Sequence, residues 1–413
     1  MKVVIIGTGR VGLPLALYLK SKKIDTIGVD TNQILIDSVN SRIMPFKEEG
    51  FDKILKKNPL KIYPSINSLP NANYYIITVG TPLEKNLEPD LKNIIDVLND
   101  LKNKLKKNDT IILRSTVSPG TTNFVKKFLN KKTKFKIGKD LFLAHCPERL
   151  AEGHALNELS SIPQILGADD ELSIKHVKKL FLKMKTETKI CSSNQAELIK
   201  LFSNSSRYLY FATINFLAMK SLKYKEDPHK IIELANYKYP RPITGLPGFT
   251  AGTCLRKDFG MISDGTNGAD ILTSAWRINE SLPDFLVEYC INNISKIAKK
   301  NILILGYTFK ADTDDVRDSL VPKLVNSIIK EVPSKIIISD PYIQKKDLDL
   351  PYDTTFISNY EKALDNIDIC FIGTNHTIYK KNKTKILKKL KFNKSSVVDI
   401  WNILETNNIF RKI

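Results

Sequence analysis

The chain has 413 residues, of which 42% are hydrophobic, and its formal net charge is +20 at pH 7. A chain of this length exceeds one ordinary hydrophobic core, so we expect two or three domains. Its five cysteines, at 146, 191, 254, 290 and 370, form no CxxC pair, which argues against a disulfide framework and a zinc site and favours a reducing compartment.

The chain begins with MKVVIIGTGRVG, which runs directly into an apolar strand and lacks the long apolar stretch and cleavage site of a signal peptide. The apolar runs are too short to span a bilayer. We therefore expect a soluble, cytoplasmic protein that does not bind membranes.

Short apolar strands alternate with helical patterns from residue 1 to about 190. The strand candidates are residues 2–7, 26–30, 74–80, 110–116, 141–146 and 163–168. This alternation predicts an α/β domain with a parallel, doubly wound sheet.

Three glycines form a GxGxxG pattern between the first strand and the first helix. Gly7 allows the tight turn, Gly9 lets the backbone approach a pyrophosphate, and Gly12 lets the helix pack on the strand. Asp30 ends the next strand, where a carboxylate can bind the ribose hydroxyls. Because this acid would repel a 2′-phosphate, the pattern predicts NAD as the cofactor.

Two polar stretches follow later strands, RSTVSPGTT at 114–122 and CPERLAEG at 146–153. Ligands bind at the carboxyl ends of strands in a doubly wound sheet, so Thr116, Glu148 and Glu152 are expected to converge near the nicotinamide. The alternative is structural: Thr116 is a turn residue, and the two glutamates stabilise a helix N-terminus.

Beyond residue 193 the pattern becomes helical, with helices expected at 196–224, at 229–236 and from about 270 to 299. Lys200 and Asn204 share one face of the first of these helices. Apolar residues surround that face, so we expect this helix to be buried on most sides. Lys200 then either pairs with Glu197 or another acid, or forms with Asn204 a pair that stabilises an oxyanion.

A cysteine lies in the small-residue loop GFTAGTCLRKD, residues 248–258. The neighbouring cations favour the thiolate of Cys254, which is the nucleophilic form. Asp258 is either a helix cap or a base that handles a water molecule.

Alternation of strands and helices returns at 301–306, 335–340, 368–374 and 396–400, and the strand that ends at Asp340 corresponds to the one that ends at Asp30. The sequence therefore predicts two Rossmann-like sheet domains, at 1–192 and 300–413, joined by a long-helix domain at 193–299.

These motifs together resemble the nucleotide-sugar 6-dehydrogenases, the UDP-glucose/GDP-mannose dehydrogenase family. The resemblance covers essentially the whole chain and includes seven ordered motifs: GTGRVGLPLA, VGTP, RSTVSPGTT, CPERLAEG, AELIKLFSN, GFTAGTCLRKD and LGYTFKADTDDVRDS. It implies oxidation of a sugar C6 alcohol to a carboxylate by two NAD⁺ in succession, through a thiohemiacetal and a thioester on Cys254. It also implies that the last domain holds the UDP.

The resemblance assigns roles residue by residue. Catalytic roles fall on Thr116, Glu148, Glu152, Lys200, Asn204, Cys254 and Asp258. Cofactor contacts fall on Gly7, Gly9, Arg10, Val11, Gly12, Asp30, Gly80, Thr81, Ser115, Thr116, Glu152, Lys257 and Arg317. Substrate contacts fall on Glu148, Arg149, Leu150, Lys200, Asn204, Arg207, Arg241, Phe249, Gly252, Phe309 and Lys310.

The chain departs from the family pattern at Arg10, Ser118, Phe216 and Arg256, none of which removes a catalytic group. The CPER motif, in which Arg149 follows Glu148, resembles that of the enzymes that oxidise UDP-N-acetylmannosamine or UDP-N-acetylglucosamine. UDP-glucose is the alternative substrate. An inactive nucleotide-binding protein is a more distant alternative. The charge of +20 is either a set of solvated helix faces or an aid in attracting an anionic substrate, and we expect no nucleic-acid partner, no metal and a homodimer.

Overall fold

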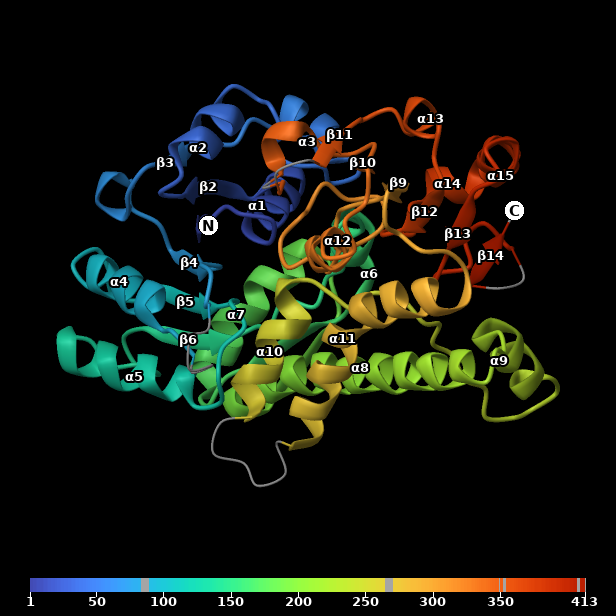
Figure 1. Ribbon diagram of the computed structural model, residues 1–413. Helices are drawn as coiled ribbons and strands as arrows, with labels where there is room; N and C mark the ends of the chain where they lie inside the picture. Colours follow the sequence, from blue (N-terminus) through green and yellow to red (C-terminus); the bar gives the residue numbers. More distant parts are fainter. Residues whose placement is uncertain (83–88, 264–269, 349, 352–353, 407–408, 413) are drawn as a thin grey trace. The chain divides into compact units, whose positions relative to one another are not determined.

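The structure is a computed structural model that describes residues 1–82, 89–263, 270–348, 350–351, 354–406 and 409–412 (Figure 1). The chain forms two compact units, Met1–Asn204 with Lys257–Thr266, and Ser205–Arg256 with Asn267–Ile413. The division into three domains at residues 192 and 299 stays a prediction.

The described part of the first unit contains one eight-stranded sheet, in the order β3-β2-β1-β4-β5-β6-β7-β8. Neighbouring strands are parallel except β6 and β7. The strands are β1 (Lys2–Ile6), β2 (Asp25–Val29), β3 (Ile62–Tyr63), β4 (Tyr74–Ile77), β5 (Thr110–Leu113), β6 (Phe142–His145), β7 (Gln164–Gly167) and β8 (Thr188–Cys191). Because the order reverses beside β1, the crevice between the ends of β1 and β4 is where a doubly wound sheet binds its ligand.

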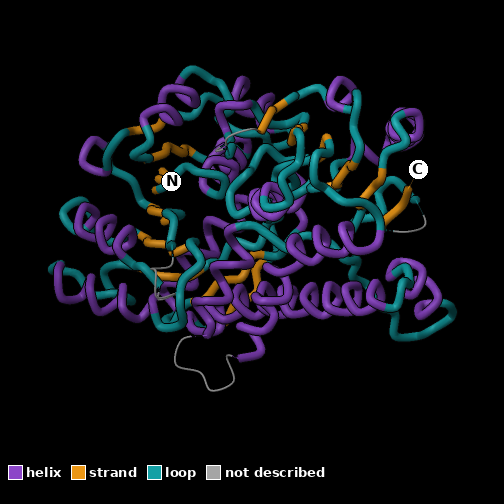
Figure 2. The backbone as a smooth tube through the Cα atoms, viewed as in Figure 1, coloured by secondary structure: helices purple, strands orange, loops and turns teal. Residues whose placement is uncertain are grey.

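The central strands β1, β4 and β5 of the first unit are almost continuously apolar because both faces of the sheet are covered there. In β1, Val3 and Ile5 belong to one buried cluster, whereas Val4 and Ile6 belong to another on the opposite face. Helices that follow the strands along the chain supply both layers (Figure 2). They are α1 (Gly12–Ser21), α2 (Gln33–Asn40), α3 (Phe51–Lys57), η1 (Ile66–Ser68), α4 (Lys92–Leu101), α5 (Thr121–Lys132), α6 (Ala155–Ser161) and α7 (Glu171–Met184).

The described part of the second unit contains a six-stranded sheet, in the order β11-β10-β9-β12-β13-β14, in which only β13 and β14 pair antiparallel. The strands are β9 (Asn301–Leu305), β10 (Lys335–Ser339), β11 (Thr354–Phe356), β12 (Ile369–Ile372), β13 (Ser396–Val398) and β14 (Phe410–Lys412). Residues of β9 again alternate between two buried clusters.

The two sheets repeat the same turn after their central strand. Gly7 and Gly306 have φ of +90° and +91°. In each turn a backbone amide donates to the acid at the end of the neighbouring strand, from Thr8 to Asp30 and from Tyr307 to Asp340, both at 2.7 Å. The predicted α/β class with two Rossmann-like sheets and a long helix between them is confirmed.

The remaining helices are α8 (Ser193–Lys223), α9 (Pro228–Asn236), α10 (Thr253–Ser263), α11 (Asp270–Asn293), α12 (Val321–Ile329), η2 (Lys345–Asp347), α13 (Tyr360–Ala363), α14 (Thr377–Lys381) and α15 (Lys383–Phe392). The long α8 begins in the first unit and continues into the second. The last long helix of this stretch ends at Asn293 and not near Lys299 as expected. The amides of Ile294 and Ser295 both turn back to the carbonyl of Cys290, and Lys299 has a left-handed φ of +59°.

The expectation that α8 is buried on most sides is wrong. Phe202, Phe216 and Leu217 are 58%, 51% and 47% exposed. Phe202 and Phe216 are fourteen residues apart, close to four helical turns, so they lie on nearly the same face. An apolar pattern around a helix therefore did not reveal which face the chain itself covers.

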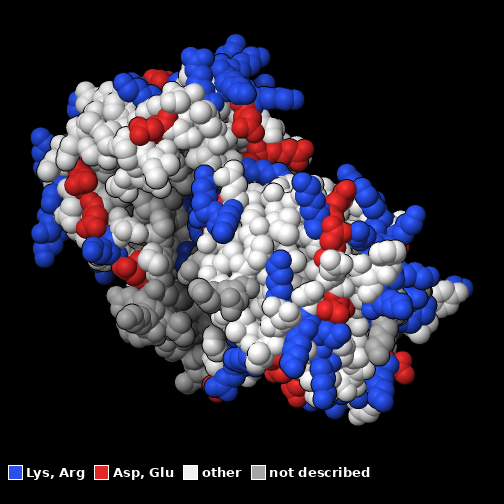
Figure 3. All heavy atoms as spheres, turned by 45° about the horizontal axis from the view of Figure 1, so that its top comes forward, with Lys and Arg blue, Asp and Glu red and all other residues white. Residues whose placement is uncertain are grey.

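Within the described residues, no helix is both long and apolar enough to cross a membrane. On the face of the molecule seen in Figure 3, lysine and arginine side chains are scattered, with acidic side chains among them.

Candidate active site

The turn between β1 and α1 has the backbone geometry of a dinucleotide site. A Cβ at Gly12 would lie 2.0 Å from the carbonyl oxygen of Gly7, so a larger residue would separate α1 from the turn. A Cβ at Gly9 would meet nothing within 4 Å, and the same is true of Gly80 after β4. The backbone is therefore bare at the two turns that flank the crevice, as the close approach of a pyrophosphate requires.

Asp30 ties the end of β2 to this turn. Its Oδ2 accepts from the amide and hydroxyl of Thr8, at 2.7 and 3.2 Å, and its Oδ1 accepts from the amide of Asn32 at 3.0 Å. A half-buried carboxylate at this place fits the ribose hydroxyls of NAD. The turn residues, with Val11 at the N-cap of α1, are the ones that would hold NAD, which supplies hydride acceptance when bound.

The segments that follow β4 and β5 contact each other through Thr81 and Thr116. The hydroxyl of Thr81 donates to the carbonyl of Thr116 at 2.6 Å, and it accepts from the ammonium group of Lys257 at 3.0 Å. The hydroxyl of Ser115 donates to the carbonyl of Val79, also at 2.6 Å. Four predicted cofactor residues, Thr81, Ser115, Thr116 and Lys257, thus lie on the carboxyl side of the sheet.

Asp258 is the most deeply buried of the predicted catalytic side chains that the structure describes, with no exposed surface. Its Oδ2 accepts from the side-chain amide of Asn204 at 2.5 Å. Burial raises the pKa of Asp258, although the charges of Lys257 and Lys200 and the bond from Asn204 act in the opposite direction. Its Oδ1 is buried without a hydrogen-bond donor among the described residues. A buried carboxyl with one unsatisfied oxygen is suited to hold a water molecule or a substrate hydroxyl.

Glu197 is not the partner of Lys200 on α8. The carboxylate of Glu197 accepts from the amides of Gly120 and Thr122, at 2.7 and 2.6 Å, and from the hydroxyl of Thr122 at 2.5 Å. Glu197 therefore caps the N-terminus of α5, where it also meets the positive end of the helix dipole. Lys200 instead acts on the charge of Asp258.

Glu148 is held by a buried ion pair. Its Oε2 accepts from Arg114 at 2.7 Å, and its Oε1 accepts from the amides of Arg149 and Leu150, at 2.7 and 3.0 Å. Arg114 also donates to the side chain of Gln164 at 3.0 Å. With both oxygens engaged, Glu148 shapes the CPER turn in this structure. Arg149 in turn donates to the carbonyl of Pro163 at 2.5 Å.

Glu152 forms an ion pair with Arg10, which lies in the dinucleotide turn, and both side chains are largely buried. The guanidinium of Arg10 also stacks over the ring of Phe46, 5.0 Å from its centroid. This pair joins the predicted catalytic turn to the turn between β1 and α1.

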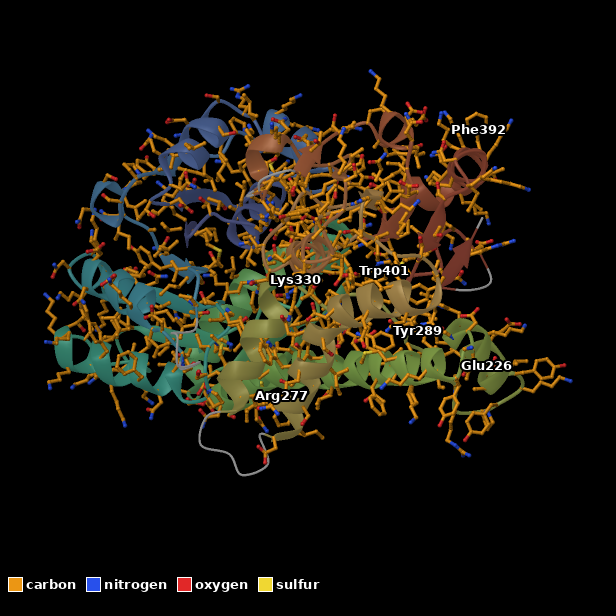
Figure 4. All side chains as sticks on the ribbon, viewed as in Figure 1. Glu226, Arg277, Tyr289, Lys330, Phe392 and Trp401 are labelled. Carbon is orange, nitrogen blue, oxygen red and sulfur yellow. The ribbon has the colours of Figure 1, made fainter. Side chains whose placement is uncertain are left out.

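The second unit holds the other predicted residues. Phe309 lies against Gly252, where φ is +97° and a Cβ would come within 2.6 Å of the ring. Phe249 is buried and packs edge-on against Trp401, which Figure 4 labels. The side chain of Cys254 lies outside the described part of the chain, although its backbone lies in the first turn of α10.

The charged substrate and cofactor residues of the second unit lie on its surface or at its edge. Arg317 forms a bidentate pair with Asp315, at 2.6 to 3.1 Å. Arg241 is exposed and rests on Tyr239. Arg207 is exposed on α8, and Lys310 is half-buried after β9.

Sequence reasoning missed Arg114, Gln164 and Glu48, which organise the turn that carries Glu148 and Glu152. The signal for Arg114 was visible, since a charged residue that directly follows four buried strand residues needs a partner. Gln164 and Glu48 had no such signal, because they lie 50 and 105 residues from the groups that they contact.

Comparison with known proteins adds an independent line of evidence. The family model for the NAD binding domain of the UDP-glucose/GDP-mannose dehydrogenase family matches residues 1–185, and the model for its UDP binding domain matches residues 303–406. A UDP-N-acetyl-D-mannosamine dehydrogenase from Campylobacter jejuni is 31% identical over 91% of this chain and 95% of that protein. The enzyme of that name from Pyrococcus horikoshii is 29% identical over 92% and 90% of the two chains.

Solved structures agree with this assignment. The structure of the Pyrococcus horikoshii enzyme has a TM-score of 0.84 and 28% identity, and the match covers 94% of this chain and 93% of that one. A UDP-N-acetyl-mannosamine dehydrogenase from Staphylococcus aureus also has a TM-score of 0.84, with 25% identity over 98% and 96% of the chains. The bare-backbone dinucleotide turn and the two matched domains lead to one conclusion: this chain belongs to the UDP-glucose/GDP-mannose dehydrogenase family of NAD-dependent nucleotide-sugar dehydrogenases.

Proposed function

We propose that this protein oxidises the C6 alcohol of a UDP-N-acetylhexosamine, with UDP-N-acetyl-D-mannosamine as the first choice and UDP-N-acetyl-D-glucosamine as the second. The observation that carries the choice is the extent of the match: relatives that bear the first sugar in their names align with almost the whole chain. Arg149 after Glu148 supports the same choice. UDP-glucose is the runner-up substrate.

In this proposal Cys254 is the nucleophile. The alcohol first loses a hydride to NAD⁺ and a proton to a base, which gives the aldehyde. The thiolate adds to the aldehyde, the thiohemiacetal gives a second hydride to a second NAD⁺, and water cleaves the resulting thioester to the carboxylate and the thiolate. Overall, one alcohol, one water and two NAD⁺ give one carboxylate, two NADH and three protons.

The contacts within the first unit support the roles that we propose for its residues. The buried Asp258 carboxyl would handle the water or the substrate hydroxyl, since Asn204 binds one of its oxygens and no donor among the described residues reaches the other. Lys200 and Asn204 supply the positive charge and the donor that an oxyanion needs. Glu152 and Thr116, near the dinucleotide turn, assist proton transfer and hydrolysis.

We propose further that the protein is a homodimer. The exposed Phe202 and Phe216 on nearly the same face of α8 support it, since large apolar side chains of this kind are the usual cores of interfaces. Replacement of Phe216 by Glu should then give a monomer in sedimentation, whereas a wild-type monomer would contradict the proposal. The scattered cysteines, which form no CxxC pair in the sequence, favour the cytoplasm as its location.

A panel of UDP- and GDP-sugars with NAD⁺, followed by NADH absorbance, tests the substrate. UDP-N-acetyl-D-mannosamine should give the highest kcat/KM and two NADH per sugar. A pocket built for an acetamido group leaves polar groups unpaired around glucose, so UDP-glucose should be a poor substrate. Faster turnover of UDP-glucose would favour the runner-up.

A further inference from the structure

Glu48 is a buried acid that belongs to no sequence motif of the site. It lies in the connection between α2 and α3, and only 2% of its surface is exposed. Its Oε2 accepts from the amide of Gly153 at 3.0 Å, and its Oε1 accepts from the amide of Ala155 at 2.9 Å. The Glu48 carboxylate thus binds two backbone amides on the C-terminal side of Glu152.

The turn that Glu48 binds contains backbone amides that need hydrogen-bond acceptors. Gly153 has a left-handed φ of +86°, which directs the chain sharply after Glu152. Ala155 begins α6, whose first amides have no acceptor within the helix. Glu158 accepts from the amide of Ala151 at 2.5 Å, so the turn is held on both sides of Glu152.

The same connection also supports the partner of Glu152. Phe46, two residues before Glu48, lies under the guanidinium of Arg10, which pairs with Glu152. The segment from Phe46 to Glu48 therefore supports Glu152 in two ways. It binds the backbone that follows Glu152, and it contacts Arg10, the cation that pairs with the Glu152 carboxylate.

We propose that Glu48 is a positioning residue that sets the Glu152 carboxylate against the dinucleotide turn. The proposal rests on the proposed function for the role of Glu152. A catalytic carboxylate must be held within a fraction of an ångström of its working place, and a loss of that support lowers the rate without removing a reacting group.

Glu48→Gln is the primary test, because it keeps the size of the side chain but turns one acceptor into a donor that faces a backbone N–H. Glu49→Gln is the matched control: it removes the same charge one residue away, at an exposed position. We expect kcat to fall roughly ten- to a hundredfold in Glu48→Gln, with little change in the KM for the sugar. The control variant Glu49→Gln should have the kcat and KM of the wild type.

A double mutant separates positioning from general damage. If Glu48 acts through Glu152, adding Glu48→Gln to Glu152→Gln should cause no further loss of kcat. If the two losses multiply, the positioning role is wrong. Should Glu48→Gln fail to fold, Glu48→Asp replaces it, since the shorter acid keeps the charge but cannot reach both amides, and the same non-additivity is expected.

Two measurements do not depend on turnover. Hydrogen exchange of the peptide that contains Gly153 and Ala155 should quicken in Glu48→Gln and stay unchanged in Glu49→Gln. NAD⁺ binding, titrated by fluorescence, should weaken in the first variant only. Unchanged exchange and binding would overturn the proposal for Glu48. A wild-type protein that oxidises no nucleotide sugar would instead refute the proposed function and leave these two measurements valid.

Discussion

We propose that the preference for NAD⁺ over NADP⁺ depends on Asp30. A 2′-phosphate would stand beside a carboxylate that already accepts three hydrogen bonds, and such like-charge contacts cost several kcal/mol. We expect kcat/KM with NAD⁺ to exceed that with NADP⁺ by at least about a hundredfold. Asp30→Asn should reduce this preference for NAD⁺. The control Asp25→Asn, at the exposed start of β2, should leave the preference unchanged. Equal use of both cofactors by the wild type would show that Asp30 has another role.

In the proposed function, formation of the acid depends on Cys254. Cys254→Ser should preserve the fold and NAD⁺ binding, whereas formation of the uronic acid should fall by orders of magnitude, because a hydroxyl without a dedicated base is a far weaker nucleophile. Product analysis should then find an aldehyde or a slowly hydrolysed ester. Near wild-type formation of the acid would remove Cys254 from the mechanism.

The other cysteines provide the control for this prediction. Burial raises the pKa of Cys146 and of Cys290 to about 12, and it also raises the pKa of Cys191 and Cys370. These thiols stay protonated at neutral pH and should react slowly. Iodoacetamide should therefore inactivate the enzyme with its label on Cys254, and UDP-sugar should protect it. Inactivation that coincides with labelling of another cysteine would contradict this.

At the scale of elements, the loop before α10 is held by contacts within the second unit. The side chain of Asn215, on α8, both donates to the carbonyl of Gly248 and accepts from its amide, at 2.9 and 3.0 Å. The ring of Trp401 occupies the space where a Cβ of Gly248 would lie, at 2.2 Å. This loop leads directly to Cys254.

Gly248→Ala should therefore be an overpacking mutation. We expect a loss of about 1–3 kcal/mol in the free energy of unfolding, measured in urea, together with a lower kcat. The smaller side chain in Trp401→Leu should reduce the cost of Gly248→Ala when the two are combined. If the losses in the free energy of unfolding from the two substitutions simply add, a clash with Trp401 is not the cause of the destabilisation by Gly248→Ala.

At the scale of the whole molecule, two buried acids make stability depend on pH. Burial raises the pKa of Asp399 and of Asp109 to about 6. Since these folded values exceed the unfolded one, the native state keeps protons that the unfolded state has lost. The stabilisation is full below about pH 4 and is lost as the pH rises through about 6.

Asp399→Asn should remove its share of this dependence. The wild type should lose stability relative to the variant between about pH 4 and 7, by up to about 3 kcal/mol. Urea unfolding at several pH values measures the difference, and Asp365→Asn, at an exposed site, is the control. A constant difference across that range would show that Asp399 does not titrate in it.

The sequence by itself determined the α/β class, the two sheets with a helical stretch between them, the dinucleotide turn and the family. These follow from local patterns: apolar strand runs, glycines at turns, and acids at strand ends. Thr8 and Asp30 contact each other because both lie at the ends of adjacent parallel strands.

Only the tertiary structure decided which polar groups meet. Asn204 reaches Asp258 across 54 residues, and Arg10 reaches Glu152 across 142. Glu197, four residues into α8, caps α5 and does not pair with the nearby Lys200. The order of the strands and the packing of helices on the sheet set these distances, and neither is encoded in the residues next to each group. For the same reason the apolar pattern of α8 could not distinguish a face covered by the chain from a face that is exposed.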